Sequence, residues 1–339
     1  MNVNKIILGL FTILASSFNL VQAAELNVYS HRQPFLIQPF LEAFSQKTGI
    51  KTNVLYSSKG LAQRLRSEGK NSPADVVLTV DIGRLYIYRD LNLLSEVKSA
   101  KILENVPSHL RAADNTWFAL SKRSRIIVTS KDRIAPGAIK TIEDLSDPKW
   151  KGKICSRPGS HVYNRALMAS VIAHHGSEKA EKWASGLVNN LARRPQGNDR
   201  AQVKAIYEGI CDVAIINNYY YGKLKFSEDE DQRKWAKALN LTFPNQGANG
   251  RGAHINISGG GVALYSKNKT NAVALLEFLS DPISQRLYGE INFEYPVNPK
   301  VNLTEELKSW GSFKEDQLPI QRIAELSREA QMMIDRVGW

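Results

Sequence analysis

The chain has 339 residues, of which 43% are hydrophobic and 23% are charged, values that are ordinary for a folded globular protein. This composition excludes an intrinsically disordered chain, and the length exceeds what one hydrophobic core usually supports, so two lobes are expected. The formal net charge of +12 would suit an anionic partner, but the basic residues are dispersed without a nucleic-acid-binding motif, so nucleic acid is not an expected partner.

Residues 1–23 predict a secretory signal peptide. Lys5 supplies a positive start, Ile6 to Leu14 form an apolar stretch too short to span a bilayer, and residues 21–23 (Val-Gln-Ala) resemble a cleavage site. An uncleaved amphipathic anchor fits less well, because the segment has no charged face. We therefore expect a soluble mature protein outside the cytoplasm, with a formal charge of +11 once Lys5 is removed from the total of +12.

The first third of the mature chain alternates between strand and helix patterns. A strand is predicted over 25–30, a helix over 34–50 that ends near Gly49, a strand over 51–57, a helix over 60–69 and a strand over 74–81. Alternation of this kind is typical of a parallel sheet covered by helices.

The pattern then restarts, which favours a second lobe. The elements predicted from here on are an extended stretch over 116–131, a strand over 151–158, a helix over 163–176, strands over 211–218 and 256–267, a helix over 271–289 and charged C-terminal helices. We therefore expect two α/β lobes joined by extended segments. In such folds, ligands bind in the crevice at the carboxyl ends of the strands.

Two cysteines, Cys155 and Cys211, each lie in a short apolar run that reads as a strand. If the two strands are neighbours, the thiols can form a disulfide in an oxidising compartment. The alternative is a pair of buried free thiols. We favour the disulfide, because secreted chains seldom keep a spare pair of cysteines reduced.

Three consecutive tyrosines, Tyr219 to Tyr221, follow the predicted strand over 211–218. Adjacent side chains diverge on a strand or a helix, so two can converge only where the backbone turns, as Asn217 and Asn218 would allow. Tyr219 and Tyr220 could then face the crevice while Tyr221 packs back. Tyr163 follows the strand of Cys155, so a disulfide would bring it close to this pair.

Phenolate oxygens are hard anionic ligands, and three of them would neutralise a trivalent cation such as ferric iron. Tyrosines are also common in cores and in sugar-stacking sites. The residue types alone leave these alternatives open.

Six segments make the chain resemble the periplasmic ferric-ion-binding proteins of bacterial iron ABC importers, also called bacterial transferrins. They are SPADVVLTVDIGRL, SKRSRIIV, DPKWKGKI, PQGNDRAQ, NNYYYGKL and HINISGGGV. The resemblance implies a type II periplasmic-binding-protein fold, with two α/β lobes joined by a hinge and a ligand cleft between them. The expected division is residues 24–120 and 255–299 for lobe 1, and 121–254 and 300–339 for lobe 2.

The same resemblance implies that Fe(III) is the cargo and that an inner-membrane ABC permease is the partner of a monomeric periplasmic protein. By motif, Tyr163, Tyr219 and Tyr220 are the implied iron ligands. In members that use a synergistic anion such as carbonate, an arginine of the SKR segment holds it, which here is Arg123. Arg125 would share a strand face with Arg123 and is the reserve candidate.

One departure concerns the loop after the first strand, where many relatives carry a His-Tyr pair of ligands. This chain reads YSHRQPF, which places Gln33 and Pro34 at those positions. His31 could replace the missing imidazole, but it is displaced by two positions. Four other histidines have weaker claims: His161, His174, His175 and His254.

Other functions have less support in the sequence. Catalysis is not expected, since no G-x-S-x-G, H-E-x-x-H or Cys-His constellation is present. A more credible alternative is the same fold binding a small organic anion through Arg123, Arg157 and helix N-termini.

Overall fold

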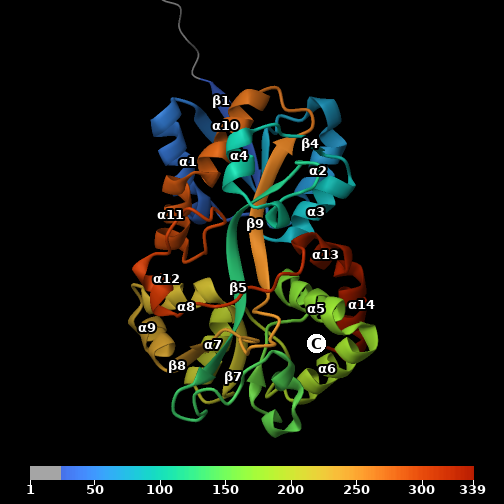
Figure 1. The fold of residues 1–339 in the computed structure, drawn as a ribbon, viewed down its shortest axis with the longest axis vertical. Coiled ribbons are helices and arrows are strands. Elements are labelled where there is room, and N and C mark those ends of the chain that lie inside the picture. Colours follow the sequence, from blue (N-terminus) through green and yellow to red (C-terminus); the bar gives the residue numbers. More distant parts are fainter. Residues whose placement is uncertain (1–23) are drawn as a thin grey trace, which may run out of the picture.

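The computed structural model describes residues 24–339, so the predicted signal peptide over residues 1–23 lies outside the described residues. In the first lobe, which is uppermost in Figure 1, β1 (Glu25–Ser30) lies in parallel between β2 (Lys51–Tyr56) and β3 (Val76–Thr79). The helices of this lobe are α1 (Pro34–Thr48), α2 (Leu61–Glu68), α3 (Ile82–Asp90), α4 (Ala100–Asn105), α10 (Lys269–Ser280) and α11 (Pro282–Asn292). These elements agree with the predicted alternation of strands and helices.

Two long strands connect the lobes. β5 (Phe118–Ser130) and β9 (Ile255–Ala263) pair antiparallel and run from the upper lobe into the lower one (Figure 1). β9 also pairs with β3 and with the short β4 (Leu94–Ser95), whereas the far half of β5 pairs with the strands of the second lobe. The extended segments predicted between the lobes are therefore neighbouring strands of one sheet.

Backbone crowding explains a glycine in β9. A Cβ atom added to Gly259 would lie 2.6 Å from the carbonyl oxygen of Phe118 on the paired strand. Real Cβ atoms do not approach an oxygen so closely, so only glycine lets the two crossing strands pair at this point.

The second lobe is built on β5. β7 (Val213–Asn217) pairs antiparallel with β5, β6 (Ile154–Cys155) lies parallel to β7, and β8 (Leu239–Thr242) also pairs with β5. The helices of this lobe are α5 (Val162–His175), α6 (Ser177–Asn189), α7 (Asp199–Tyr207), α8 (Asn218–Lys225), α9 (Glu230–Lys237) and α12 (Glu305–Ser309).

The C-terminal helices contact both lobes. α13 (Ile320–Glu325) packs against α3 of the first lobe and α5 of the second, and α14 (Ser327–Val337) packs against α5 and α6. Beyond α14, Trp339 covers the loop that precedes α5: its indole Nε1 donates to Ser156 Oγ (2.9 Å), and its carbonyl accepts from the Gly159 amide (3.0 Å). The loop entering α5 is therefore held in place by residue 339.

The structure contains the predicted disulfide between Cys155 and Cys211, with Cα atoms 5.8 Å apart. The two residues belong to neighbouring strand segments, because β6 and β7 pair directly and Cys155 lies opposite Ala214. The prediction of a bridge between adjacent strands is thus confirmed.

One predicted helix is divided in two. The stretch 271–289 was expected as a single helix, but α10 ends at Ser280 and α11 begins at Pro282. Proline cannot continue the first helix, and the Asp281 side chain caps the second by accepting from the Ser284 amide. The Asp281-Pro282 pair therefore ends the helix although the apolar periodicity continues through it.

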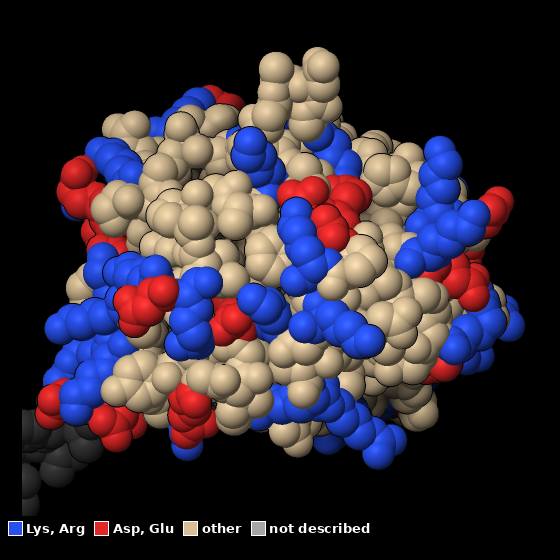
Figure 2. Space-filling model, turned by 90° about the horizontal axis from the view of Figure 1, so that it is seen from below, with Lys and Arg blue, Asp and Glu red and all other residues tan. Residues whose placement is uncertain are grey.

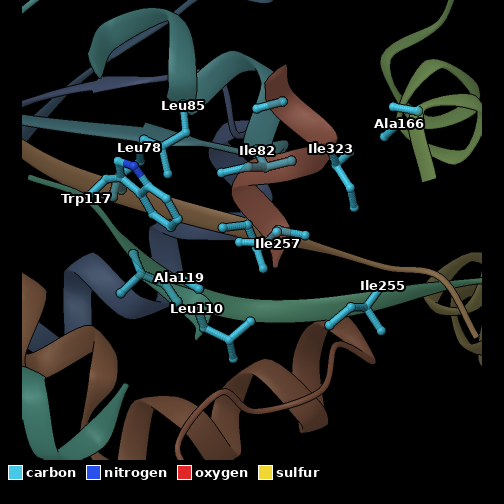
Figure 3. Packing of buried hydrophobic residues seen from close by; sticks show 14 of the residues in the cluster. Leu78, Ile82, Leu85, Leu110, Trp117, Ala119, Ala166, Ile255, Ile257 and Ile323 are labelled. Carbon is cyan, nitrogen blue, oxygen red and sulfur yellow. The ribbon is translucent and has the colours of Figure 1, made fainter. Parts of the chain in front are cut away.

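The core of the first lobe gathers around Trp117, which is fully buried together with Leu78, Ile82 and Leu85 (Figure 3). Ile323 of α13 joins the same hydrophobic cluster, in keeping with the packing of α13 against α3.

No helix among residues 24–339 has the length and apolar character needed to cross a membrane. On the lower face, basic side chains alternate with acidic and uncharged ones (Figure 2).

Candidate metal centre

The paired tyrosines lie where the chain turns from strand to helix. β7 ends at Asn217 and α8 begins at Asn218, so the backbone changes direction immediately before Tyr219. The rings of Tyr219 and Tyr220 are 4.5 Å apart, whereas Tyr221 packs edge-on against Trp310 at 5.6 Å. Two of the three tyrosines therefore share one side of the turn, and the third packs elsewhere.

Tyr163, in the first turn of α5, meets this pair. The Tyr219 hydroxyl donates to the Tyr163 hydroxyl oxygen at 3.0 Å, and the Asn217 side-chain amide donates to the Tyr219 oxygen at 3.3 Å. The side chain of His161 caps α5 by accepting from the Tyr163 amide. The structure thus brings together the three tyrosines that the sequence singled out.

A buried cluster of opposite charges supports Tyr163. The Asp199 carboxylate is fully buried and accepts from Arg125 Nη1 (2.7 Å), from Arg157 Nη1 (2.9 Å) and from the Asn217 amide (2.8 Å). The guanidinium groups of Arg157 and Arg125 lie 5.0 and 6.0 Å from the centre of the Tyr163 ring. Cations over an aromatic face are attracted to its quadrupole, so the cluster fixes the ring in place.

Burial and mutual repulsion keep the paired phenols protonated in this structure. Burial raises the pKa of Tyr219 well above its ordinary value, and the nearby Tyr163 and Tyr220 raise it further. Burial, with Tyr163 and Asp199, raises the pKa of Tyr220 to about 12. Ionisation of these hydroxyls at neutral pH therefore requires a strongly charged cation among them.

The tyrosines open into a cavity of about 340 Å³ between the lobes, which we call the tyrosine chamber. Its polar lining includes Arg157, Arg200 and Lys223 from the second lobe. Arg200 lies 5.8 Å from the centre of the Tyr220 ring, and its Nε has no hydrogen-bond partner within residues 24–339. Arg200 was not predicted as a site residue, although it lies in the segment PQGNDRAQ, one of those that carry the family resemblance.

The two predicted anion-binding arginines have different surroundings. Arg123 is buried, and its Nη2 donates to Asp81 at 3.2 Å, while its Nη1 has no partner among the described residues. Its guanidinium lies 5.1 Å from the Tyr163 ring centre. Arg125 is instead occupied by Asp199, Asn164 and Asn217. Each arginine has one nitrogen without a partner among the described residues, Nη1 in Arg123 and Nε in Arg125, but both terminal nitrogens of Arg125 are engaged whereas Arg123 has a free one.

His31 lines the tyrosine chamber, but both of its ring nitrogens have partners. Nδ1 lies 2.7 Å from the Ser57 carbonyl oxygen, and Nε2 lies 3.0 Å from the Tyr88 hydroxyl. Because a carbonyl can only accept, Nδ1 carries the proton and Nε2 accepts from Tyr88. In this arrangement, His31 has no lone pair to give to a metal.

Two other histidines pair with carboxylates, His174 with Asp316 and His175 with Glu143. His254 is buried, and neither of its ring nitrogens has a hydrogen-bond partner among residues 24–339. Burial and Arg157 lower the pKa of the His161 imidazole to about 3, so it is neutral. Within residues 24–339 there is no group of three or more His, Cys, Asp or Glu side chains that could hold a metal ion.

Two lobes, crossing strands and a ligand chamber between them define a class, the two-lobed solute-binding proteins. The chain belongs to the bacterial extracellular solute-binding protein family, whose family model matches residues 40–315. It is 40% identical over 318 residues to Iron uptake protein A2 of Synechocystis sp., covering 94% of this chain and 91% of that protein.

Solved structures with a similar fold include ferric iron-binding proteins. The fold is similar to that of Mannheimia haemolytica ferric iron-binding protein A in an open conformation, with 46% identity, 93% and 98% of the two chains covered and a TM-score of 0.86. It is also similar to a Trichodesmium protein solved with iron and citrate, at 42% identity, 93% and 100% coverage and a TM-score of 0.88. The predicted two-lobe fold and the resemblance to ferric-ion-binding proteins are confirmed.

Proposed function

We propose that this protein captures ferric iron between its lobes through the phenolate oxygens of Tyr163, Tyr219 and Tyr220. The observation that carries the proposal is the meeting of three phenols from two separate segments, with the Tyr219 hydroxyl 3.0 Å from that of Tyr163. Three phenolates balance the charge of a trivalent ion, and phenolate is a hard oxygen ligand suited to Fe(III). The ferric-ion-binding relatives support this assignment.

An anion completes the coordination in this proposal. Three ligands leave positions open on the ion, and Arg123 Nη1 is an unused buried donor beside Tyr163. We assign Arg123 to a synergistic anion such as carbonate; Arg157 and Arg200 line the chamber itself. The Trichodesmium relative, which was solved with citrate beside iron, supports an accompanying anion.

The proposed cellular role rests on the family and on the predicted signal peptide. We propose a monomeric periplasmic binding protein that delivers iron to an inner-membrane ABC permease and catalyses no reaction. The relatives described above are binding and uptake proteins, which supports this role. We also propose the division into residues 24–120 with 255–299 for lobe 1, and 121–254 with 300–339 for lobe 2.

An iron titration followed in the visible spectrum tests the assignment. Tyrosinate-to-iron charge transfer should colour the loaded protein, whereas an organic anion bound alone would leave it colourless. The Tyr219→Phe, Tyr220→Phe double variant should lose the colour and more than about 100-fold in affinity, because outer partners of a metal site alone are worth about 10- to 100-fold.

Tyr221→Phe is the matched control, since it removes the same oxygen from the neighbouring residue that packs against Trp310. It should keep both colour and affinity. Unchanged colour and affinity in the double variant would refute the ligand assignment.

A further inference from the structure

The terminal nitrogens of Arg125 all face acceptors of the protein itself. Nη1 donates to Asp199 (2.7 Å) and to Asn217 Oδ1 (3.2 Å), while Nη2 donates to Asn164 Oδ1 and to the Ile215 carbonyl (3.2 Å). The side chain is buried, and within residues 24–339 it is absent from the lining of the tyrosine chamber. Four acceptors around two nitrogens hold this guanidinium group in one position.

Asn217 connects Arg125 to a proposed iron ligand. It is the last residue of β7 and lies directly opposite Arg125 on β5. Its side chain is buried: Oδ1 accepts from Arg125 Nη1, and Nδ2 donates to the Tyr219 hydroxyl oxygen at 3.3 Å. A single amide group therefore joins the arginine to the tyrosine.

The arginine determines which end of this amide faces the tyrosine. A side-chain amide has an accepting oxygen and a donating nitrogen, whereas a guanidinium group can only donate. If Nδ2 were turned toward Arg125, two donors would face each other at a buried site, which is costly. The amide oxygen would then point at Tyr219, and a phenolate there would meet lone pairs in place of an N–H group. Arg125 thus selects the orientation in which Tyr219 receives a donor.

The three proposed ligands differ in what supports them. Cationic side chains lie over the rings of Tyr163 and Tyr220. Among residues 24–339, Asn217 is the one side chain other than a tyrosine that hydrogen-bonds a hydroxyl of the three. A hydrogen bond accepted by a charged oxygen is stronger than one accepted by a neutral oxygen, so this contact strengthens when Tyr219 becomes a phenolate.

From these contacts we infer that Asn217 donates a hydrogen bond to the Tyr219 phenolate oxygen in the iron complex, and that Arg125 is the positioning residue that orients this amide. The inference rests on the proposed function, since it requires Tyr219 to be an iron ligand. Groups that hydrogen-bond a metal ligand tune the metal and change its affinity by about 10- to 100-fold. Arg125 then serves the tyrosines, and the anion is left to Arg123.

The colour of the iron complex reports on this hydrogen bond. Charge transfer moves an electron from a phenolate to Fe(III), and a donor on the phenolate oxygen lowers the energy of the electrons that move. Removing the donor should therefore shift the absorption band to longer wavelength. A loss of folding stability by itself leaves the position of the band unchanged.

Asn217→Leu removes the amide and nearly keeps the shape of the side chain. When the mature variant is titrated with Fe(III) in bicarbonate buffer, it should bind one iron, lose about tenfold or more in affinity and absorb at longer wavelength than the wild type. Asn217→Ser, whose hydroxyl is too short to reach both partners, should shift the band in the same direction and replaces the first variant if that one does not fold.

Asn190→Leu is the matched control. Asn190 is a similarly buried asparagine, and its Nδ2 donates to the backbone carbonyls of Leu145 and Asp147, away from the tyrosines. This variant should lose stability yet keep the wild-type band and iron affinity. A band shift of equal size in Asn190→Leu would overturn the inference, because the shift would then follow from destabilisation.

Arg125→Lys tests the orienting role, because lysine keeps a charge beside Asp199 but lacks the rigid planar fork that holds the amide. It should move the band in the same direction as Asn217→Leu. If Arg125 acts through Asn217, the double variant should absorb where Asn217→Leu alone absorbs. A further shift in the double variant would overturn the positioning role. An affinity loss in Arg125→Lys that appears only with bicarbonate would also overturn it, since the residue would then bind the anion.

The remaining outcomes separate this inference from the proposed function. An unchanged band in a folded Asn217→Leu or Asn217→Ser variant, beside a coloured wild type, would overturn the hydrogen bond to Tyr219 and leave iron binding by the tyrosines intact. A wild-type protein that develops no charge-transfer band with Fe(III) would instead reject the proposed function.

Discussion

The imidazole of His31 accepts a hydrogen bond from the buried hydroxyl of Tyr88, 3.0 Å away. Burial raises the pKa of Tyr88, and burial also lowers that of His31, so both groups are neutral at pH 7 and the tyrosine is the donor. The backbone carbonyl of Ser57 accepts a hydrogen bond from the other ring nitrogen, Nδ1. The histidine that could have replaced the missing first-lobe ligand is thus part of the lobe's own structure.

We therefore expect His31→Gln to keep the iron affinity within about threefold. The free energy of unfolding should fall by about 1–2 kcal/mol, because the variant loses hydrogen bonds at a buried site. Iron titration and denaturant unfolding measure the two quantities, with Tyr219→Phe as the variant that must lose colour. A tenfold or greater loss of iron affinity in His31→Gln would show that this imidazole reaches the metal.

Asp199→Asn should destabilise the second lobe and weaken iron binding together. The substitution leaves Arg125 and Arg157 without their buried counter-charge, and removing one partner of a buried ion pair costs about 3–5 kcal/mol. Chemical denaturation of the metal-free protein measures the loss. Asp335→Asn, an exposed carboxylate, is the control. A loss below about 1 kcal/mol would mean that the arginines do not depend on Asp199.

Breaking the disulfide should lower the free energy of unfolding by about 2–4 kcal/mol. Its two cysteines are 56 positions apart, and closing a loop of that size restricts the unfolded chain by roughly 4 kcal/mol on the chain-entropy model. The Cys155→Ala, Cys211→Ala variant and the reduced wild-type protein should unfold at the same denaturant concentration. Unfolding at the midpoint of the oxidised protein would contradict the expectation.

Glu143 should make a contribution to stability that depends on pH. Burial alone would raise its pKa, but the Arg251 guanidinium and hydrogen bonds from Asn245 and His175 lower it to about 2. A carboxyl whose pKa is lower in the folded protein stabilises it above the unfolded pKa, here near 4.5, and loses that effect as the pH falls toward 2.

Glu143→Gln should therefore lower the free energy of unfolding at pH 7 by about 1.5–3 kcal/mol, the range for hydrogen bonds to a charged group. The difference from the wild type should shrink between pH 4.5 and 2. Thermal unfolding across this range measures it, with the exposed Glu42→Gln as control. A difference that stays constant with pH would show that the charge of Glu143 is not the cause.

The strands and the tyrosine turn were predictable because each is a local pattern. Apolar runs bounded by Gly, Pro and Asn predicted the bounds of β1, β7 and β9 to within a few residues. Asn217 and Asn218 indicated the turn after which Tyr219 and Tyr220 lie on the same side of the backbone. The disulfide was predictable because both cysteines stood in predicted strands. Local patterns of this kind need no knowledge of distant parts of the chain.

The surroundings of the site were not predictable in the same way. Asp199, Arg125 and Arg157 meet from α7, β5 and the loop after β6, and nothing in their local sequence marks them as partners. Likewise, Lys59 and Arg84 become part of one chamber with Arg165 only when the two lobes face each other. Sequence spacing carries no signal for groups that the crossing strands bring together.

Trp339 links the loop that leads into α5 to a residue far along the chain. Its indole and its backbone carbonyl bind Ser156 and Gly159, and the same loop leads to Tyr163 in the first turn of α5. Removing the side chain of Trp339 would therefore loosen the segment that positions one of the three proposed iron ligands while it leaves all three in the chain.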